Sequence, residues 1–212
     1  YPAPTGEINP LRGNRFWARA RGKRMRSPLI DFRELDPLVS IDSSDSASLD
    51  NMLEVLLVGG LDPLQSMRIL VPPAWENVDG LDPDLRAFYE YFALHMDPWD
   101  GPAGIVLTDA RYAACTLDRN GLRPARWALS TDRRLVIASE AGVVDWPAKD
   151  IVAKGRLGPG EMLAVDLHRG ELLDTARIDE INASRAPFKR WLKQGVKYLQ
   201  TDLIDPRLAA EP

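Results

Sequence analysis

Two turn-forming segments around a pair of short apolar runs constrain this fold more than any other feature. Residues 97–104 read DPWDGPAG and residues 117–126 read LDRNGLRPAR. Gly, Pro and Asn-Gly pairs of this kind mark chain reversals. Residues 103–108 and 112–117 are short and apolar or β-branched, which is typical of paired antiparallel strands. The sequence therefore predicts a hairpin near the middle of the chain.

Further elements are expected on both sides of this hairpin. Turn-bounded apolar runs after it predict four more strands, over residues 126–130, 134–139, 162–167 and 171–174. Capping Ser and Asp residues followed by apolar positions at helical spacing predict three helices before it, over residues 47–58, 63–70 and 82–96.

The two ends of the chain are interpreted differently. Residues 1–40 are rich in Pro, Gly and Arg, which predicts loop with short extended pieces. A last helix is expected over residues 178–200, with an apolar face that includes Phe188, Leu192 and Val196. Helices first and an antiparallel meander afterwards favour a layered α+β fold over a doubly wound sheet.

Composition narrows the possible functions. The 212 residues are 45% apolar and 27% charged, as in an ordinary globular domain, and the net charge of −4 predicts no general affinity for nucleic acid or membrane. Cys115 is the only cysteine, so an internal disulfide and a cysteine-rich metal site are excluded. With only His95 and His168, no metal centre is expected. No apolar run is long enough to span a bilayer, and the chain does not open with a secretory leader. We therefore expect the protein to be located in the cytoplasm.

A collinear set of sequence blocks resembles the glutaminase domain in the large subunit of glutamate synthase. The blocks are GEIN at 6–9, LRGNR at 11–15, SDS at 44–46, VPPAW at 71–75, DGPAG at 100–104, DRNGLRP at 118–124 and KGRLGPGE at 154–161. They follow the family's order, and the resemblance extends to about residue 195. One such block alone would be weak evidence for the resemblance, but the set of blocks in the family's order is strong evidence.

The resemblance implies a fold and a domain boundary. The family's glutaminase domain is a class II glutamine amidotransferase, an N-terminal-nucleophile hydrolase with a four-layer αββα sandwich. This chain looks like its C-terminal part, so we expect an incomplete sandwich that lacks its N-terminal half and is entered in mid-domain at Tyr1. Residues 1–200 are interpreted as a partial amidotransferase domain, and residues 201–212 as the start of a linker to the next domain.

The resemblance also implies a reaction. In the family an N-terminal cysteine attacks the amide of glutamine, with its own α-amino group as general base. The ammonia passes to a synthase domain, which carries FMN and an iron–sulfur cluster and aminates 2-oxoglutarate. The cysteine and these domains are outside this chain, so no cofactor is expected in it. Glutamine is the expected ancestral ligand, and the synthase domains are the expected partners.

Three site residues follow from positions that match the family. Gly6 corresponds to the glycine whose backbone N–H stabilises the oxyanion, and Thr5 stands where the family has the oxyanion asparagine. Losing one such donor typically costs about 100- to 1000-fold in rate. Asp45 matches the aspartate that accepts the α-amino group of glutamine, by a charge-assisted contact. The arginine that binds the substrate carboxylate lies upstream, so we expect this chain alone not to hydrolyse glutamine.

Each feature also has a purely structural interpretation. Asp45 lies in a serine-rich run that caps helices well, and Asp118–Pro124 can be a structured turn held by pairing of Arg123. Cys115 lies in an apolar run and is interpreted as a small hydrophobic residue rather than a nucleophile. The basic, aromatic segment Arg12–Arg26 could be a nucleic-acid arm. In the family, however, its first four residues, RGNR at 12–15, pack beside the glutamine site, and we favour that structural explanation.

Two further functions stay open at this point. The chain could be a non-catalytic interaction or regulatory module with the same fold. It could also be one half of an enzyme that is assembled in trans with a separate cysteine-bearing chain.

Overall fold

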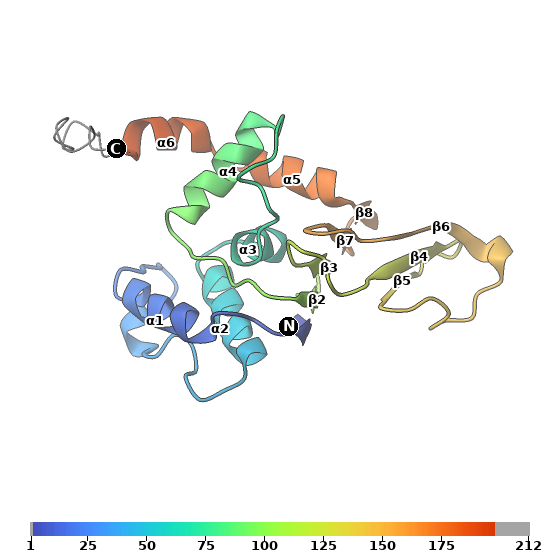
Figure 1. Ribbon diagram of the computed structural model, residues 1–212, viewed down its shortest axis with the longest axis horizontal. Coiled ribbons are helices and arrows are strands. Elements are labelled where there is room, and N and C mark those ends of the chain that lie inside the picture. The colour runs from blue at the N-terminus through green and yellow to red at the C-terminus, as the bar shows by residue number, and fades with distance from the viewer. Residues whose placement is uncertain (1, 198–212) are drawn as a thin grey trace, which may run out of the picture.

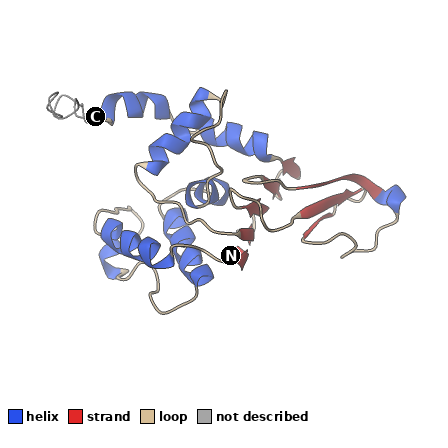
Figure 2. Ribbon diagram, in the orientation of Figure 1, coloured by secondary structure: helices blue, strands red, loops and turns tan. Residues whose placement is uncertain are grey.

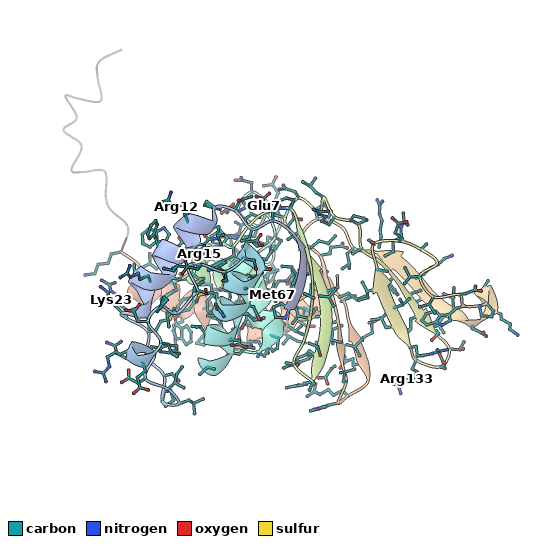
Figure 3. All side chains as sticks on the ribbon, turned by 90° about the horizontal axis from the view of Figure 1, so that it is seen from below. Glu7, Arg12, Arg15, Lys23, Met67 and Arg133 are labelled. Carbon is teal, nitrogen blue, oxygen red and sulfur yellow. The ribbon has the colours of Figure 1, made fainter. Side chains whose placement is uncertain are left out.

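Three layers make up the part of the chain that the structure, a computed structural model, describes, which is residues 2–197. Helices cover one face of a five-stranded sheet, and a three-stranded sheet lies on its other side (Figures 1 and 2). Figure 3 views the molecule along another direction and shows the helices, the larger sheet and the smaller sheet side by side. The α+β class expected from the order of the elements is confirmed.

The larger sheet has the order β1-β2-β3-β7-β8, and all its neighbours are antiparallel. Its strands are β1 (Pro2–Gly6), β2 (Ala103–Thr108), β3 (Tyr112–Leu117), β7 (Met162–Asp166) and β8 (Glu171–Leu173). The central hairpin therefore has the predicted bounds. Side chains alternate along β2: Ala103, Ile105 and Leu107 are buried under the helices, and Val106 points to the opposite face.

The smaller sheet has the order β5-β4-β6 and is also antiparallel. Its strands are β4 (Arg126–Ser130), β5 (Leu135–Ala138) and β6 (Ile151–Arg156). Cys115, Leu117 and Leu163 of the larger sheet pack against Trp127 and its neighbours in the smaller one, which forms a second, smaller core. The two sheets are thus joined by apolar contact.

Strand β6 was not predicted, because Lys154 and Gly155 interrupt its apolar pattern. The structure explains the glycine. A Cβ on Gly155 would lie 2.9 Å from the ring of Trp127, which is its partner across β4 and β6. The position therefore requires glycine for packing, although glycine weakens the strand signal.

Residues 2–197 hold six α-helices, and five of them belong to the expected regions. They are α1 (Leu11–Gly22), α2 (Asp45–Val58), α3 (Pro63–Leu70), α4 (Pro83–Ala93), α5 (Thr175–Ser184) and α6 (Phe188–Gly195). Ser44, Asp62 and Asp82 cap α2, α3 and α4 by accepting backbone N–H bonds, as their sequence suggested. Helix α3 is buried along its whole length.

The loop expected over residues 1–40 is wrong in one respect, since α1 lies inside it. Its first residue follows Pro10, which makes no side-chain cap bond, and its first turn holds no acidic residue. Local capping and dipole signals for a helix are therefore missing. The helix is held by tertiary contacts instead, with Asn14 and Ala18 buried against the rest of the molecule.

The single helix expected over residues 178–200 is also wrong. Two helices occupy this region and are separated at Ala186 and Pro187, where proline lacks the N–H that a continuous helix needs. Val196 follows the end of α6 and is not part of its apolar face. Residues 198–200, and the linker expected over residues 201–212, lie outside the described residues.

A buried ion pair joins the helix layer. Arg68 of α3 has no exposed side-chain surface, and its Nε lies 3.0 Å from Oδ1 of Asp179 in α5. Its Nη1 donates to the carbonyl oxygen of Gly160 at 2.6 Å. Burial raises the pKa of Asp179, against the opposing effect of the Arg68 charge. Each charge depends on the other, because neither is well solvated.

Removing one charge of this pair should destabilise the protein strongly. Asp179→Ala is expected to lower the free energy of unfolding by about 3–5 kcal/mol, because the Arg68 guanidinium then stays buried without a counter-charge. Arg68→Met combined with Asp179→Leu should recover most of this loss, since it removes both charges and retains apolar volume. Urea unfolding measures both effects. A double variant as unstable as Asp179→Ala would contradict this account.

Candidate functional site

The end of β1 lies against the turn that precedes β2. The N–H of Glu7 donates to the carbonyl of Pro102 at 3.4 Å, and the N–H of Asn9 donates to the carbonyl of Asp100 at 2.7 Å. N–H groups alternate between the two edges of an extended strand, so the N–H of Gly6 points away from β2. The predicted oxyanion donor therefore lies on the outer side of β1, which is an edge strand of the larger sheet among residues 2–197; this side is called the open edge below.

Two glycines make this contact possible by a reciprocal close approach. Gly6 has φ +136°, and a Cβ on it would lie 2.0 Å from the carbonyl oxygen of Pro102. Gly101 has φ +141°, and a Cβ on it would lie 2.0 Å from the carbonyl oxygen of Glu7. Both distances are far below van der Waals contact, and both φ values are unfavourable for residues with a side chain. Only glycine fits at either position.

Asp45 is the first residue of α2, and its carboxylate reaches back to the segment that carries Gly6. Oδ2 accepts the N–H of Ile8 at 2.8 Å, and Oδ1 accepts the N–H of Ser46 at 2.7 Å. The N-cap is Ser44, whose hydroxyl accepts the N–H of Ala47 at 3.2 Å, so the capping role considered for Asp45 belongs to its neighbour. Through its Oδ2 bond Asp45 contacts Ile8, which lies two residues after Gly6 in the chain.

Thr5 is placed by its backbone alone. It lies in β1 opposite Gly104 of β2, and the position of its side chain lies outside what the structure describes. Whether its hydroxyl can act as a donor therefore stays a prediction.

Asp118 fixes the turn that follows β3 and lies next to the first residue of β2. Its side chain is fully buried, with Oδ1 accepting the N–H of Ala103 at 3.1 Å and Oδ2 accepting the N–H groups of Asn120 at 2.8 Å and Gly121 at 3.2 Å. A carboxylate can accept several such bonds at once. The structured turn expected over Asp118–Pro124 is therefore present, and it holds the first residue of β2 in place.

The arginine that ties down this turn is Arg119, and the prediction for Arg123 is wrong. Nη2 of Arg119 lies 2.5 Å from Oδ2 of Asp100, whose carbonyl receives the bond from Asn9. Arg123 is exposed. Arginine pairs well with a carboxylate wherever the fork of its guanidinium reaches it, and sequence alone does not show which of the two arginines does so.

The Gly-Pro-Gly turn at residues 158–160 contacts the turn that Asp118 holds. The N–H of Gly160 donates to the carbonyl of Asp118 at 2.8 Å. A Cβ on Gly121 would lie 2.7 Å from Cα of Pro159, so the two turns also touch closely. These contacts make the turn part of the scaffold of the site.

Cys115 lies on the inner face of β3 between the two sheets and is 3% exposed. Burial raises the pKa of its thiol to about 11. At neutral pH almost none of it is thiolate, which is the nucleophilic form. The interpretation of Cys115 as a small hydrophobic residue is confirmed.

Within residues 2–197, none of the helices combines the length and the apolar character that crossing a bilayer requires. The same part of the chain holds no cluster of three or more His, Cys, Asp or Glu side chains placed to hold a metal ion.

Comparison with known proteins gives the family of this chain. The chain belongs to the class-II glutamine amidotransferases, whose family model matches residues 1–191. It is 43% identical over 195 residues to the NADH glutamate synthase of Schizosaccharomyces pombe, over 91% of this chain and 9% of that protein. It is 39% identical over 198 residues to the ferredoxin-dependent glutamate synthase of Antithamnion sp., over 92% of this chain and 13% of that protein.

A bacterial relative gives the same result. The chain is 36% identical over 204 residues to the large chain of the NADPH glutamate synthase of Bacillus subtilis, over 95% of this chain and 13% of that protein. The chain therefore spans 9–13% of the length of these relatives. The resemblance seen in the sequence blocks is confirmed.

The reciprocal glycine contact can be tested directly. Gly101→Ala is expected to lower the free energy of unfolding by about 3–5 kcal/mol, because its Cβ collides with backbone that cannot move away freely. Gly142→Ala is the matched control, since Gly142 also has a positive φ, of +83°, but open space around it. That variant should cost about 1–2 kcal/mol, from the backbone conformation alone. Equal losses in the two variants would show that the close approach is not the cause.

Proposed function

We propose that this chain provides the oxyanion-binding and amino-binding side of a glutamine site in a glutamate synthase. The bond between the N–H of Ile8 and the carboxylate of Asp45 carries the proposal. It joins the strand that ends at Gly6 to the helix that begins with Asp45, which are the two positions that match the family's substrate contacts. The parent reaction is hydrolysis of glutamine to glutamate and ammonia. The ammonia is then used to aminate 2-oxoglutarate.

The geometry of β1 suits the role proposed for Gly6. Its outward positions before Gly6 are Pro2 and Pro4, which have no N–H. Gly6 is therefore the first residue of this strand to offer a donor on the open edge. The bonds to the 100–102 turn fix its direction, and a donor held in place before the reaction stabilises developing negative charge best.

The geometry of Asp45 suits recognition of an ammonium group. Its two backbone donors, from Ile8 and Ser46, fix the plane of the carboxylate. A carboxylate has about four acceptor positions, so the two oxygens can still accept from a ligand. We propose that they receive the α-ammonium group of glutamine, in a charge-assisted bond.

We propose that the remaining chemistry lies in other parts of the assembled enzyme. The only thiol of the chain is the buried Cys115, so we expect the 212-residue chain by itself to release no ammonia from glutamine. An N-terminal cysteine, the FMN and the iron–sulfur cluster are assigned to segments and synthase domains with which this chain assembles. The three described layers are proposed to be three of the four layers of an αββα sandwich.

Titration of glutamine into the ¹⁵N-labelled chain tests this proposal. We expect chemical-shift changes at Gly6, Ile8 and Ser46, and weaker binding of glutaramate, which is glutamine without its α-amino group. A bond to a charged group contributes about 1.5–3 kcal/mol, so glutamine should bind about 10- to 100-fold more tightly. Asp45→Asn should remove this preference. Equal binding of the two compounds to the wild-type chain would contradict the proposed site.

The accessibility of the thiol gives a separate prediction. Cys115 should react with a thiol reagent at pH 8 only after unfolding in denaturant, because its side chain is buried and its pKa is raised to about 11. The rate of colour release from Ellman's reagent measures this. Rapid reaction of the folded chain, lost in Cys115→Ser, would instead show that this thiol is accessible and would reopen the question of a nucleophile.

A further inference from the structure

One arginine of α1 holds the segment in which Asp45 lies. Nη1 of Arg15 donates to the carbonyl of Ile41 at 2.7 Å, and Nη2 donates to the carbonyl of Ser43 at 2.5 Å. Nε and Nη2 also donate to the hydroxyl of Ser48, at 3.1 Å and 2.9 Å. Figure 3 labels Arg15 on α1, with Arg12 at the start of the same helix. The guanidinium therefore contacts the chain on both sides of Asp45.

Two of these acceptors lie outside regular secondary structure. The carbonyls of residues 41 and 43 precede α2 and fall outside its helical hydrogen bonds. Ser43 is half-buried, so its carbonyl would be costly to leave without a partner, whereas Ile41 is exposed and its carbonyl gains less. The hydroxyl of Ser48 is fully buried and itself lies 3.0 Å from the carbonyl of Ser44. Arg15 thus closes residues 41–48 into one hydrogen-bonded unit with Asp45 inside it.

The positive charge of Arg15 is not what stabilises this contact. The N-terminus of a helix carries a partial positive charge, so a cation beside it is electrostatically unfavourable. Arg15 nevertheless lies at the N-terminus of α2. Arginine at this position contributes the forked geometry of its guanidinium, which donates to several acceptors at once in a way that a lysine cannot.

The segment from Gly6 to Arg15 therefore contacts residues 41–48, which include Asp45, at two points. Ile8 binds the carboxylate itself, and Arg15 binds the backbone before it and the hydroxyl after it. The two points are seven residues apart on the chain that continues from β1 into α1. Together they set where the carboxylate stands relative to the N–H of Gly6.

We propose that Arg15 is a positioning residue for Asp45 in recognition of the α-ammonium group of glutamine. This inference rests on the proposed function, because it assigns Arg15 to the same site. Arg15 itself touches no substrate. Its effect is to hold the Asp45 carboxylate at the place where the amino group is bound while the amide end lies at Gly6.

The test compares the affinities of the chain for glutamine and glutaramate, by the same titration. Arg15→Lys keeps the charge but loses the fork, and Arg15→Met loses both. Both variants should reduce the preference for glutamine about tenfold or more and leave the affinity for glutaramate nearly unchanged. Arg12→Met is the matched control, because Arg12 is exposed on the same helix, and it should keep the wild-type preference.

Amide hydrogen exchange provides a second readout on the same variants. Loss of Arg15 should speed exchange of the Ile8 N–H, because its acceptor is then less firmly held, and exchange in β3 and β7 should not change. Faster exchange throughout the molecule would instead indicate general destabilisation and would overturn a specific positioning role.

The outcomes separate this inference from the proposed function. If Asp45→Asn abolishes the preference for glutamine and Arg15→Lys and Arg15→Met preserve it, Arg15 does not position Asp45 and the proposed site stands. If Arg15→Met weakens glutamine and glutaramate equally, its role is structural only. If the wild-type chain shows no preference, the proposed site itself is wrong. Arg15→Met in an Asp45→Asn background should add no further loss of preference, because both changes act through one group.

Discussion

The close approach between the end of β1 and the turn before β2 is the contact on which the candidate site depends. Gly6 faces the carbonyl of Pro102, and Gly101 faces the carbonyl of Glu7, with no room for a Cβ on either. The alternation of N–H groups along β1 directs the N–H of Gly6 away from β2, toward the outer side of this edge strand. The packing also places Ile8 where Asp45 can accept its N–H. The position of the carboxylate is therefore a consequence of backbone packing some distance away along the chain.

The same contact explains why sequence blocks far apart in the chain mark this family so well. The turns at 100–102, 118–121 and 158–160 are linked to one another. Arg119 pairs with Asp100, the buried carboxylate of Asp118 accepts the N–H of Ala103, and Gly160 donates to the carbonyl of Asp118. Glycine is needed at positions 101 and 121 because an added Cβ would collide with backbone atoms there. The blocks therefore identify the scaffold of the site, and the residues proposed to contact the ligand lie at its edge.

How much of the structure could be predicted follows from how local each signal is. The bounds of β2, β3 and α3 were predicted correctly, because turns and caps lie next to them in the sequence. Helix α1 could not be predicted, because its N-terminus has no local cap and buried Asn14 and Ala18 hold it instead. The break at Pro187 was missed although proline signals it, since the apolar spacing on both sides continued the helical pattern.

The site shows the same division between local and distant information. Gly6 and Asp45 were singled out from matching positions, but nothing in the sequence indicates that Asp45 accepts the N–H of Ile8, 37 residues earlier. The choice between a cap and a ligand-binding residue also changes once Ser44 is seen to be the cap. Because a serine already satisfies the N–H of Ala47, the helix does not need the carboxylate as its cap. Asp45 is thereby available for the Ile8 segment and, on our proposal, for an ammonium group that arrives beside it.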